Sequence, residues 1–116
     1  MGNIYEHSGS SIGSCVGRIE RDGSVYAGSF GGSYKGKVDR NGYVYESGLL
    51  SSGSIIGRVT NDGKIYSGSF GGSYLGHVDS SGYIFEHSGL FSDTIVGRAD
   101  SPNQLEGGAA FILLLR

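Results

Sequence analysis

The chain of 116 residues contains one cysteine, Cys15, which excludes an intrachain disulfide and a zinc site built from several thiolates. We interpret Cys15 as a small buried apolar residue rather than a reactive thiol. The first residues, MGNIYEHSGSS, lack a basic region and an apolar core, so they do not match a secretory signal. Both observations favour a cytoplasmic protein.

The sequence also lacks a strong charge and a long hydrophobic run. Its formal net charge is −2, whereas a nucleic-acid-binding domain would be basic, so no nucleic-acid partner is predicted. The apolar run at residues 109–115 is seven residues long, against the roughly 20 that a membrane-spanning helix needs. We therefore predict no membrane span.

Glycine is abundant, and it marks a repeat. The 23 glycines recur at fixed places in four related segments, residues 17–26, 36–45, 57–66 and 76–85. In each segment a short apolar run meets a turn that ends in glycine, preceded by Asp, Asn or Ser, and a second apolar run follows. Glycine adopts left-handed turn conformations without steric cost, so each segment predicts a β-hairpin.

Two hairpin registers are possible. A two-residue turn would pair Ile19 with Tyr26, whereas a three-residue loop closed by a glycine bulge would pair Ile19 with Val25. We favour the second register because it places aliphatic residues opposite each other in every copy, and a slip of one residue would mix the two faces. The predicted aliphatic pairs are Ile19 with Val25, Val38 with Val44, Val59 with Ile65, and Val78 with Ile84.

The opposite face then pairs a basic residue with an aromatic ring. These candidate binding residues are Arg18 with Tyr26, Lys37 with Tyr45, Arg58 with Tyr66, and His77 with Phe85. Our first interpretation is structural, because cross-strand pairs of this kind stabilise a sheet by roughly 0.2–1 kcal/mol each. The alternative is a binding face for a glycan or a polyanion, since sugars stack on aromatic rings and anions pair with bases.

The repeat organises the chain into one all-β domain, residues 1–116, of tandem β-hairpins about a pseudo-rotational axis. The glycines that begin each unit are 19, 21, 19 and 21 residues apart, which gives a unit of about 20 residues within a double repeat of 40. The predicted parts are a half repeat (1–9), hairpins (15–30, 34–50, 55–70 and 74–91), a degenerate cap (95–108) and an apolar tail (109–116). The linker residues Phe30, Tyr34, Leu49, Leu50, Phe70, Tyr74, Leu90 and Phe91 are expected to pack between hairpins as a second part of the core.

The two ends of the chain carry incomplete units. Residues 3–9 match the return strand at residues 83–89, and residues 97–100 begin a fifth unit whose return strand is expected at residues 104–106. The two partial units could complete each other and close the array into a ring without free sheet edges. The tail must be buried, because it is apolar on all sides. Its Ala and Leu content favours a short helix, although periodicity cannot separate helix from strand.

The tandem G-x-V-d-x-x-G-x-(V/I)-(Y/F) units, followed by Gly-Gly-Ala-Ala and an aliphatic run, resemble the bacterial four-fold β-flower family. The resemblance extends from Ile4 to Leu115. It implies hairpins arranged as petals around an axis. It implies no reaction and no site residues, because the family has no established activity.

Other candidate sites are weaker. Glu6, Glu46 and Glu86 recur every 40 residues, with His7 and His87 beside two of them, but adjacent strand residues point to opposite faces, so no metal site is predicted. The Gly-Ser-Phe-Gly-Gly-Ser-Tyr stretches lack the Lys-Ser/Thr ending of a phosphate-binding loop.

Function is therefore predicted only by class. We expect a non-enzymatic structural or interaction module without a cofactor, the alternative being a lectin-like module that binds glycans or anions. A homo-oligomer could form through the tail residues Phe111, Ile112, Leu113, Leu114 and Leu115.

Overall fold

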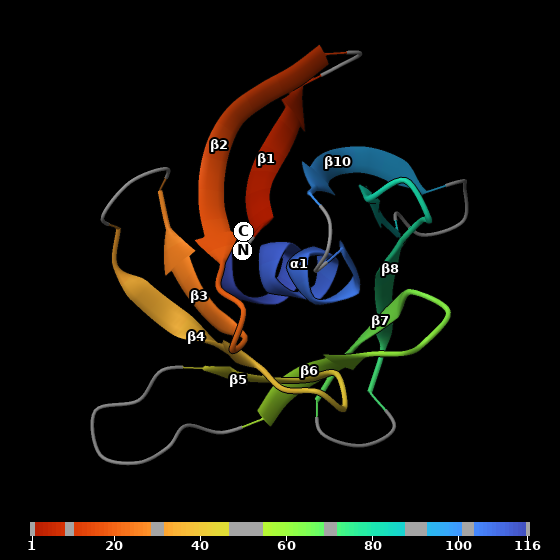
Figure 1. The fold of residues 1–116 in the computed structure, drawn as a ribbon. Helices are drawn as coiled ribbons and strands as arrows, with labels where there is room; N and C mark the ends of the chain where they lie inside the picture. Colours follow the sequence, from red (N-terminus) through yellow and green to blue (C-terminus); the bar gives the residue numbers. More distant parts are fainter. Residues whose placement is uncertain are drawn as a thin grey trace.

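The computed structural model describes residues 2–8, 11–28, 32–46, 55–68, 72–87, 93–100 and 104–115. Ten strands of this part form a closed antiparallel barrel in which every strand pairs with its neighbours in sequence, and the first pairs with the last (Figure 1). The predicted all-β class is confirmed. The strands are β1 (Gly2–Ser8), β2 (Ser11–Ile19), β3 (Ser24–Ala27), β4 (Tyr34–Val38), β5 (Tyr43–Glu46), β6 (Ile55–Val59), β7 (Lys64–Ser67), β8 (Tyr74–Val78), β9 (Tyr83–Glu86) and β10 (Thr94–Ala99).

The register of all four hairpins agrees with the three-residue loop. Ile19 lies opposite Val25, and the other three aliphatic pairs and all four base-plus-aromatic pairs form as predicted. In the first turn the Gly23 N–H donates to the Glu20 carbonyl at 2.9 Å, and Gly23 has a φ of +94°. That φ lies in the left-handed region, which is why each turn ends in glycine.

The two incomplete units close the barrel. β1 pairs with β10, with Ile4 opposite Ala99 and Tyr5 opposite Arg98. The barrel therefore contains five hairpin units: β2–β3, β4–β5, β6–β7, β8–β9 and β10–β1. The prediction of a return strand at residues 104–106 is wrong, because β1 takes that place and these residues begin a helix.

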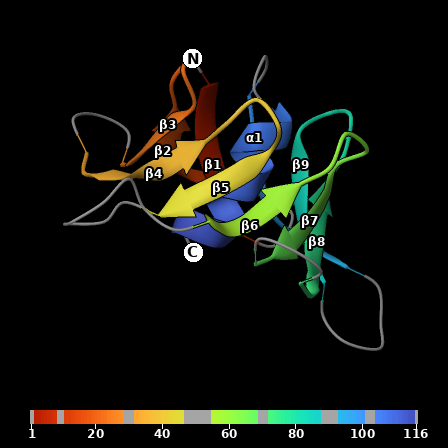
Figure 2. The same cartoon turned by 90° about the horizontal axis from the view of Figure 1, so that it is seen from below.

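One layer of the core is a ring of aliphatic side chains, one from each strand. Each of these side chains is at most 6% exposed, because alternate residues of a strand point to the barrel interior. The ring consists of Ile4, Ile19, Val25, Val38, Val44, Val59, Ile65, Val78, Ile84 and Ala99. It surrounds helix α1 (Gln104–Ala110), which occupies the middle of the barrel in Figures 1 and 2.

A second layer lies where α1 continues into the π-helical segment η1 (Phe111–Leu115). Here the glycine that begins each hairpin contacts one η1 side chain, and successive η1 residues contact successive hairpins. The contacts are Gly97 with Phe111, Gly76 with Ile112, Gly57 with Leu113, Gly36 with Leu114, and Gly17 with Leu115. A π-helix closes its hydrogen bonds between residues i and i+5, so its turn is wider than that of an α-helix. The five residues of η1 together face all five hairpins.

The predicted burial of the tail is confirmed for Ala109, Ala110 and Phe111, while the following four residues are half-buried. The tail is a helix inside its own barrel, and oligomerisation through it stays a prediction. No helix among the described residues is long and apolar enough to cross a membrane.

The linker prediction has a mixed outcome. Phe30, Leu49, Leu50, Phe70, Leu90 and Phe91 lie outside the described residues. Tyr34 and Tyr74 do not join the core: Tyr34 is 47% exposed and Tyr74 is half-buried on the outer face. The helix supplies the second part of the core instead, because it already fills the barrel interior.

Candidate ligand-binding site

The base-plus-aromatic pairs form a band on the outer face of the barrel. The guanidinium carbons of Arg18 and Arg58 each lie 4.5 Å from the ring centroid of the tyrosine opposite. The His77 ring stacks on Phe85, with centroids 4.5 Å apart and planes 8° from parallel. Cation–π contacts at exposed sites contribute about 0.5–1 kcal/mol, so the band stabilises the hairpins as well as offering a surface.

Tyrosines extend this band from one hairpin to the next. The Tyr26 and Tyr34 centroids are 5.6 Å apart, and those of Tyr66 and Tyr74 are 5.8 Å apart. Both pairs bring together strands of different hairpins, where a register shift places the two rings opposite each other. The linker tyrosines therefore belong to the outer face rather than the core.

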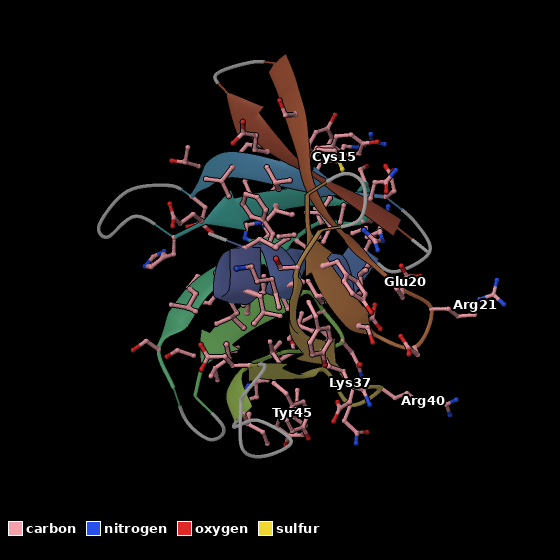
Figure 3. The ribbon with its side chains drawn as sticks, turned by 90° about the vertical axis from the view of Figure 1, so that its left-hand side faces the viewer. Cys15, Glu20, Arg21, Lys37, Arg40 and Tyr45 are labelled. Carbon is pink, nitrogen blue, oxygen red and sulfur yellow. The ribbon has the colours of Figure 1, made fainter. Side chains whose placement is uncertain are left out.

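A hollow opens over the hairpin β4–β5, and we call it the β4–β5 hollow. It has a volume of about 450 Å³, which lies within the 300–1,000 Å³ typical of small-ligand sites. Among the described residues, Tyr34, Lys37, Asp39 and Tyr45 line it. Figure 3 shows Lys37 and Tyr45 on the outside of the barrel, facing away from the central helix.

Two polar groups of the hollow, those of Asp39 and Tyr45, are held in place by hydrogen bonds. The Asp39 Oδ1 atom accepts hydrogen bonds from the backbone N–H groups of Asn41, at 2.9 Å, and Tyr43, at 3.0 Å. The Tyr45 hydroxyl donates to the other carboxylate oxygen at 3.1 Å, and this hydrogen bond raises the pKa of Tyr45. Lys37 is exposed and belongs to none of the ion pairs among the described residues. The hollow therefore combines fixed acceptors with a cation that forms no ion pair within the described part of the chain.

The equivalent position on the hairpin β8–β9 is occupied by a carboxylate. Asp93, just before β10, accepts hydrogen bonds through Oδ2 from the Tyr74 hydroxyl at 3.1 Å and from His77 Nδ1 at 3.0 Å. Its Oδ1 atom accepts from His87 Nδ1 at 3.0 Å. We call these four residues the Asp93 cluster. A carboxylate only accepts hydrogen bonds, so both Nδ1 atoms carry protons.

The Asp93 cluster alters the acid–base properties of two of its members. The His87 hydrogen bond lowers the pKa of Asp93, and the hydrogen bonds from Tyr74 and His77 act in the same direction. Burial, followed by the hydrogen bond to Asp93, raises the pKa of Tyr74 to about 12. The cluster is thus a neutral hydroxyl and two imidazoles arranged around an ionised carboxylate.

The acidic residues considered as metal ligands do not gather. Glu6 and Glu46 are exposed on different strands, and the side chain of His7 lies outside the described residues. His87 is 5.0 Å from the Tyr74 ring and bonds to Asp93 rather than joining a carboxylate from Glu86. Within the described ranges, no three His, Cys, Asp or Glu side chains are placed to hold a metal ion.

Sequence reasoning identified Lys37, Tyr45, His77 and Phe85 but missed Asp93. A departure from the 40-residue repeat could have revealed it: Asp93 stands where the preceding copy has Gly53. His87 likewise replaces Ser47, and His77 replaces Lys37. Three polar substitutions in one copy are a signal that the two hairpins have different surroundings.

No family model, curated protein or solved structure matches this chain. The resemblance to the β-flower family therefore stays a prediction, and the barrel has five hairpin units where the family name refers to four.

Proposed function

We propose that the protein is a non-enzymatic binding module that holds a carbohydrate in the β4–β5 hollow. The observation that carries this proposal is the hollow itself, where aromatic rings meet fixed polar groups on an open surface. An interaction module of this kind needs a rigid scaffold, which the closed barrel and its central helix provide.

The chemistry of the hollow suits a sugar. Tyr34 and Tyr45 offer apolar ring surface for the C–H faces of a pyranose, and each carries a hydroxyl at its edge. Asp39 accepts and Lys37 donates hydrogen bonds, which complements sugar hydroxyls that do both. Concave sites lined by aromatic residues with a few fixed polar groups are typical of small-molecule recognition.

The arrangement of titratable groups supports binding rather than catalysis. In the Asp93 cluster both imidazoles share one acceptor, and the His77 ring is stacked flat on Phe85. In the hollow, the Tyr45 hydroxyl is bonded to Asp39, so neither group is poised as a free base.

A glycan array tests the proposal directly. We expect the wild-type protein to bind a subset of glycans, and Tyr45→Ala to abolish that binding because it removes a wall of the hollow. Tyr66→Ala removes an equivalent ring from β7, outside the hollow, and serves as the control.

If both variants keep their glycan binding, or if the wild type binds no glycan, the carbohydrate proposal is wrong. A lowered melting temperature as the only effect of either variant would leave these rings the purely structural role that cross-strand pairs commonly have.

A further inference from the structure

We infer that the ligand of the β4–β5 hollow is an acidic sugar, whose carboxylate binds to Lys37 and to the Tyr34 hydroxyl. This inference rests on the proposed function and specifies its substrate class as a uronic-acid-type carbohydrate. It comes from a comparison of the two copies of the 40-residue unit. The hairpin β8–β9 binds a carboxylate of this chain, and the hairpin β4–β5 has corresponding donor groups.

The hairpin β8–β9 shows which group this surface binds. Its Tyr74 hydroxyl and His77 Nδ1 converge on one oxygen of the Asp93 carboxylate, at 3.1 and 3.0 Å. Asp93 lies 16 residues beyond His77 and is not part of the hairpin. Its carboxylate therefore contacts the hairpin through the same hydrogen bonds that a bound anion would accept. The Asp93 side chain is only 17% exposed, so most of it is covered by neighbouring groups.

The hairpin β4–β5 repeats the same donors. Tyr34 stands 40 residues before Tyr74, and Lys37 stands 40 residues before His77. Each tyrosine begins its strand and each base is the fourth residue of it, and both bases lie opposite an aromatic residue of the next strand. The hydroxyl and the cation are therefore in corresponding positions, and Lys37 carries a permanent positive charge at neutral pH.

The chain does not supply a carboxylate to this hollow in the way that it supplies Asp93. The segment that corresponds to residues 87–94 is residues 47–54, Ser-Gly-Leu-Leu-Ser-Ser-Gly-Ser, which contains no acidic residue. Position 53, the counterpart of Asp93, is glycine. An external carboxylate is the group that would complete the pattern.

The acidic Asp39 in the hollow does not oppose this reading. Its counterpart Asp79 accepts backbone hydrogen bonds from Ser81 and Tyr83 at 2.9 and 3.0 Å, as Asp39 does from its own turn. The hairpin β8–β9 holds Asp93 despite that neighbour. In the hollow, the Asp39 Oδ2 atom already accepts from the Tyr45 hydroxyl, and its second lone pair can accept from a ligand hydroxyl. Lys37 would bind the acid group at the same time, which favours a ligand that carries both groups.

Titration with matched sugars tests the inference. We would follow backbone amide chemical shifts of the full chain while adding glucuronate, glucose or acetate. Glucuronate should shift the Gly36 and Lys37 signals and bind at least tenfold more tightly than glucose or acetate, because a charge-assisted hydrogen bond contributes about 1.5–3 kcal/mol. Lys37→Met should lose this preference, whereas Lys64→Met removes an exposed lysine outside the hollow and should keep it.

Each outcome separates the two claims. Equal binding of glucose and glucuronate, both lost in Tyr45→Ala, would overturn the acidic-sugar inference and leave the carbohydrate function standing. Acetate binding as tightly as glucuronate would overturn both, since only a carboxylate would be recognised. Lys37→His gives a further check: its preference for glucuronate should persist below about pH 6.5 and weaken above it, where the imidazole loses its charge.

Discussion

The hairpins β4–β5 and β8–β9 are two copies of one repeat unit whose outer faces differ. They share register, turn geometry, inward-facing aliphatic pairs and contacts to the central helix. They differ on the outside, where Lys37 and Tyr45 border an open hollow, whereas His77 and Phe85 lie beside the seated carboxylate of Asp93. Interior positions stay glycine or aliphatic, as with Val44 and Ile84, because the barrel and its helix constrain them, and the polar differences between the two copies lie on the outer face.

This difference distinguishes repeat positions that maintain the fold from repeat positions that contact a partner. A repeated position that stays glycine or aliphatic is constrained by the packing of the barrel, because a larger or polar group there would disturb that packing. A repeated position whose residue type changes, such as Lys37 and its counterpart His77, indicates a contact that is specific to one copy. In this molecule the partner of one copy is Asp93, within the chain, and this copy is the basis of the ligand that we infer for the other.

The largest expected effect tests what the two copies share. Gly36→Ala and Gly76→Ala should each destabilise the fold by about 3 kcal/mol, because the added methyl group would overlap the backbone oxygen of Tyr45 or Phe85 and press on η1. Both variants should lose the same amount in chemical denaturation. If the losses of unfolding free energy in the two variants differ by more than a third, the two hairpins do not pack equivalently against the central helix.

The matched control for these variants is Gly28→Ala. Gly28 also has a positive φ, +83°, but the nearest atom to an added methyl group is 3.9 Å away. Only the cost of the left-handed conformation then applies, about 1 kcal/mol.

A smaller effect tests what distinguishes the copies. Asp93→Gly restores the residue found in the other copy and removes the acceptor of three hydrogen bonds. We expect a loss of about 1 kcal/mol, since the cluster is partly exposed and such ion pairs contribute little. The variant should also gain binding of glucuronate near His77, detected by chemical shifts of that hairpin.

Asp93→Asn provides the comparison for that gain. It should lose similar stability, because an amide cannot accept all three hydrogen bonds, but the side chain still fills the site. Glucuronate binding to Asp93→Asn as strong as to Asp93→Gly would show that the space left by the side chain is not what opens the site.

The smallest effect concerns alkaline pH. An unfolded tyrosine titrates near pH 10, whereas Tyr74 has a pKa of about 12 in the fold. A raised pKa stabilises the fold below pH 10, and this contribution disappears as pH rises from about 10 to 12. Ultraviolet titration should therefore show a tyrosine that ionises near pH 12, and Tyr74→Phe should remove that step. An unchanged titration curve in Tyr74→Phe would assign the late step to another tyrosine.

Much of the fold follows from the sequence because its signals are local and repeated. The aliphatic residues of each copy decided between the two hairpin registers, and the matching half units at the two ends raised the possibility of a closed ring. The return strand at residues 104–106 was wrong because strand pairing across the closure depends on β1, about 100 residues away in the chain.

The candidate site could be predicted only in part. The pairing of Lys37 with Tyr45 follows from register alone. The positions of Tyr34 and Asp93 do not, because they depend on how neighbouring hairpins meet at the β3–β4 and β9–β10 junctions, each of which contains a register shift. Apolar linker residues suggest core packing by composition, yet the helix already fills the barrel, so Tyr34 and Tyr74 remain outside.

The one-to-one correspondence between η1 residues and hairpins limits how this protein can change its size. Most tandem-repeat proteins grow or shrink by duplication or loss of units, since each unit contacts only its neighbours. Here every unit also meets a single residue of a segment that is not itself repeated. A sixth copy would find no counterpart on the axis, so gene duplication within this array would have to be matched by a coordinated change in an unrelated part of the chain.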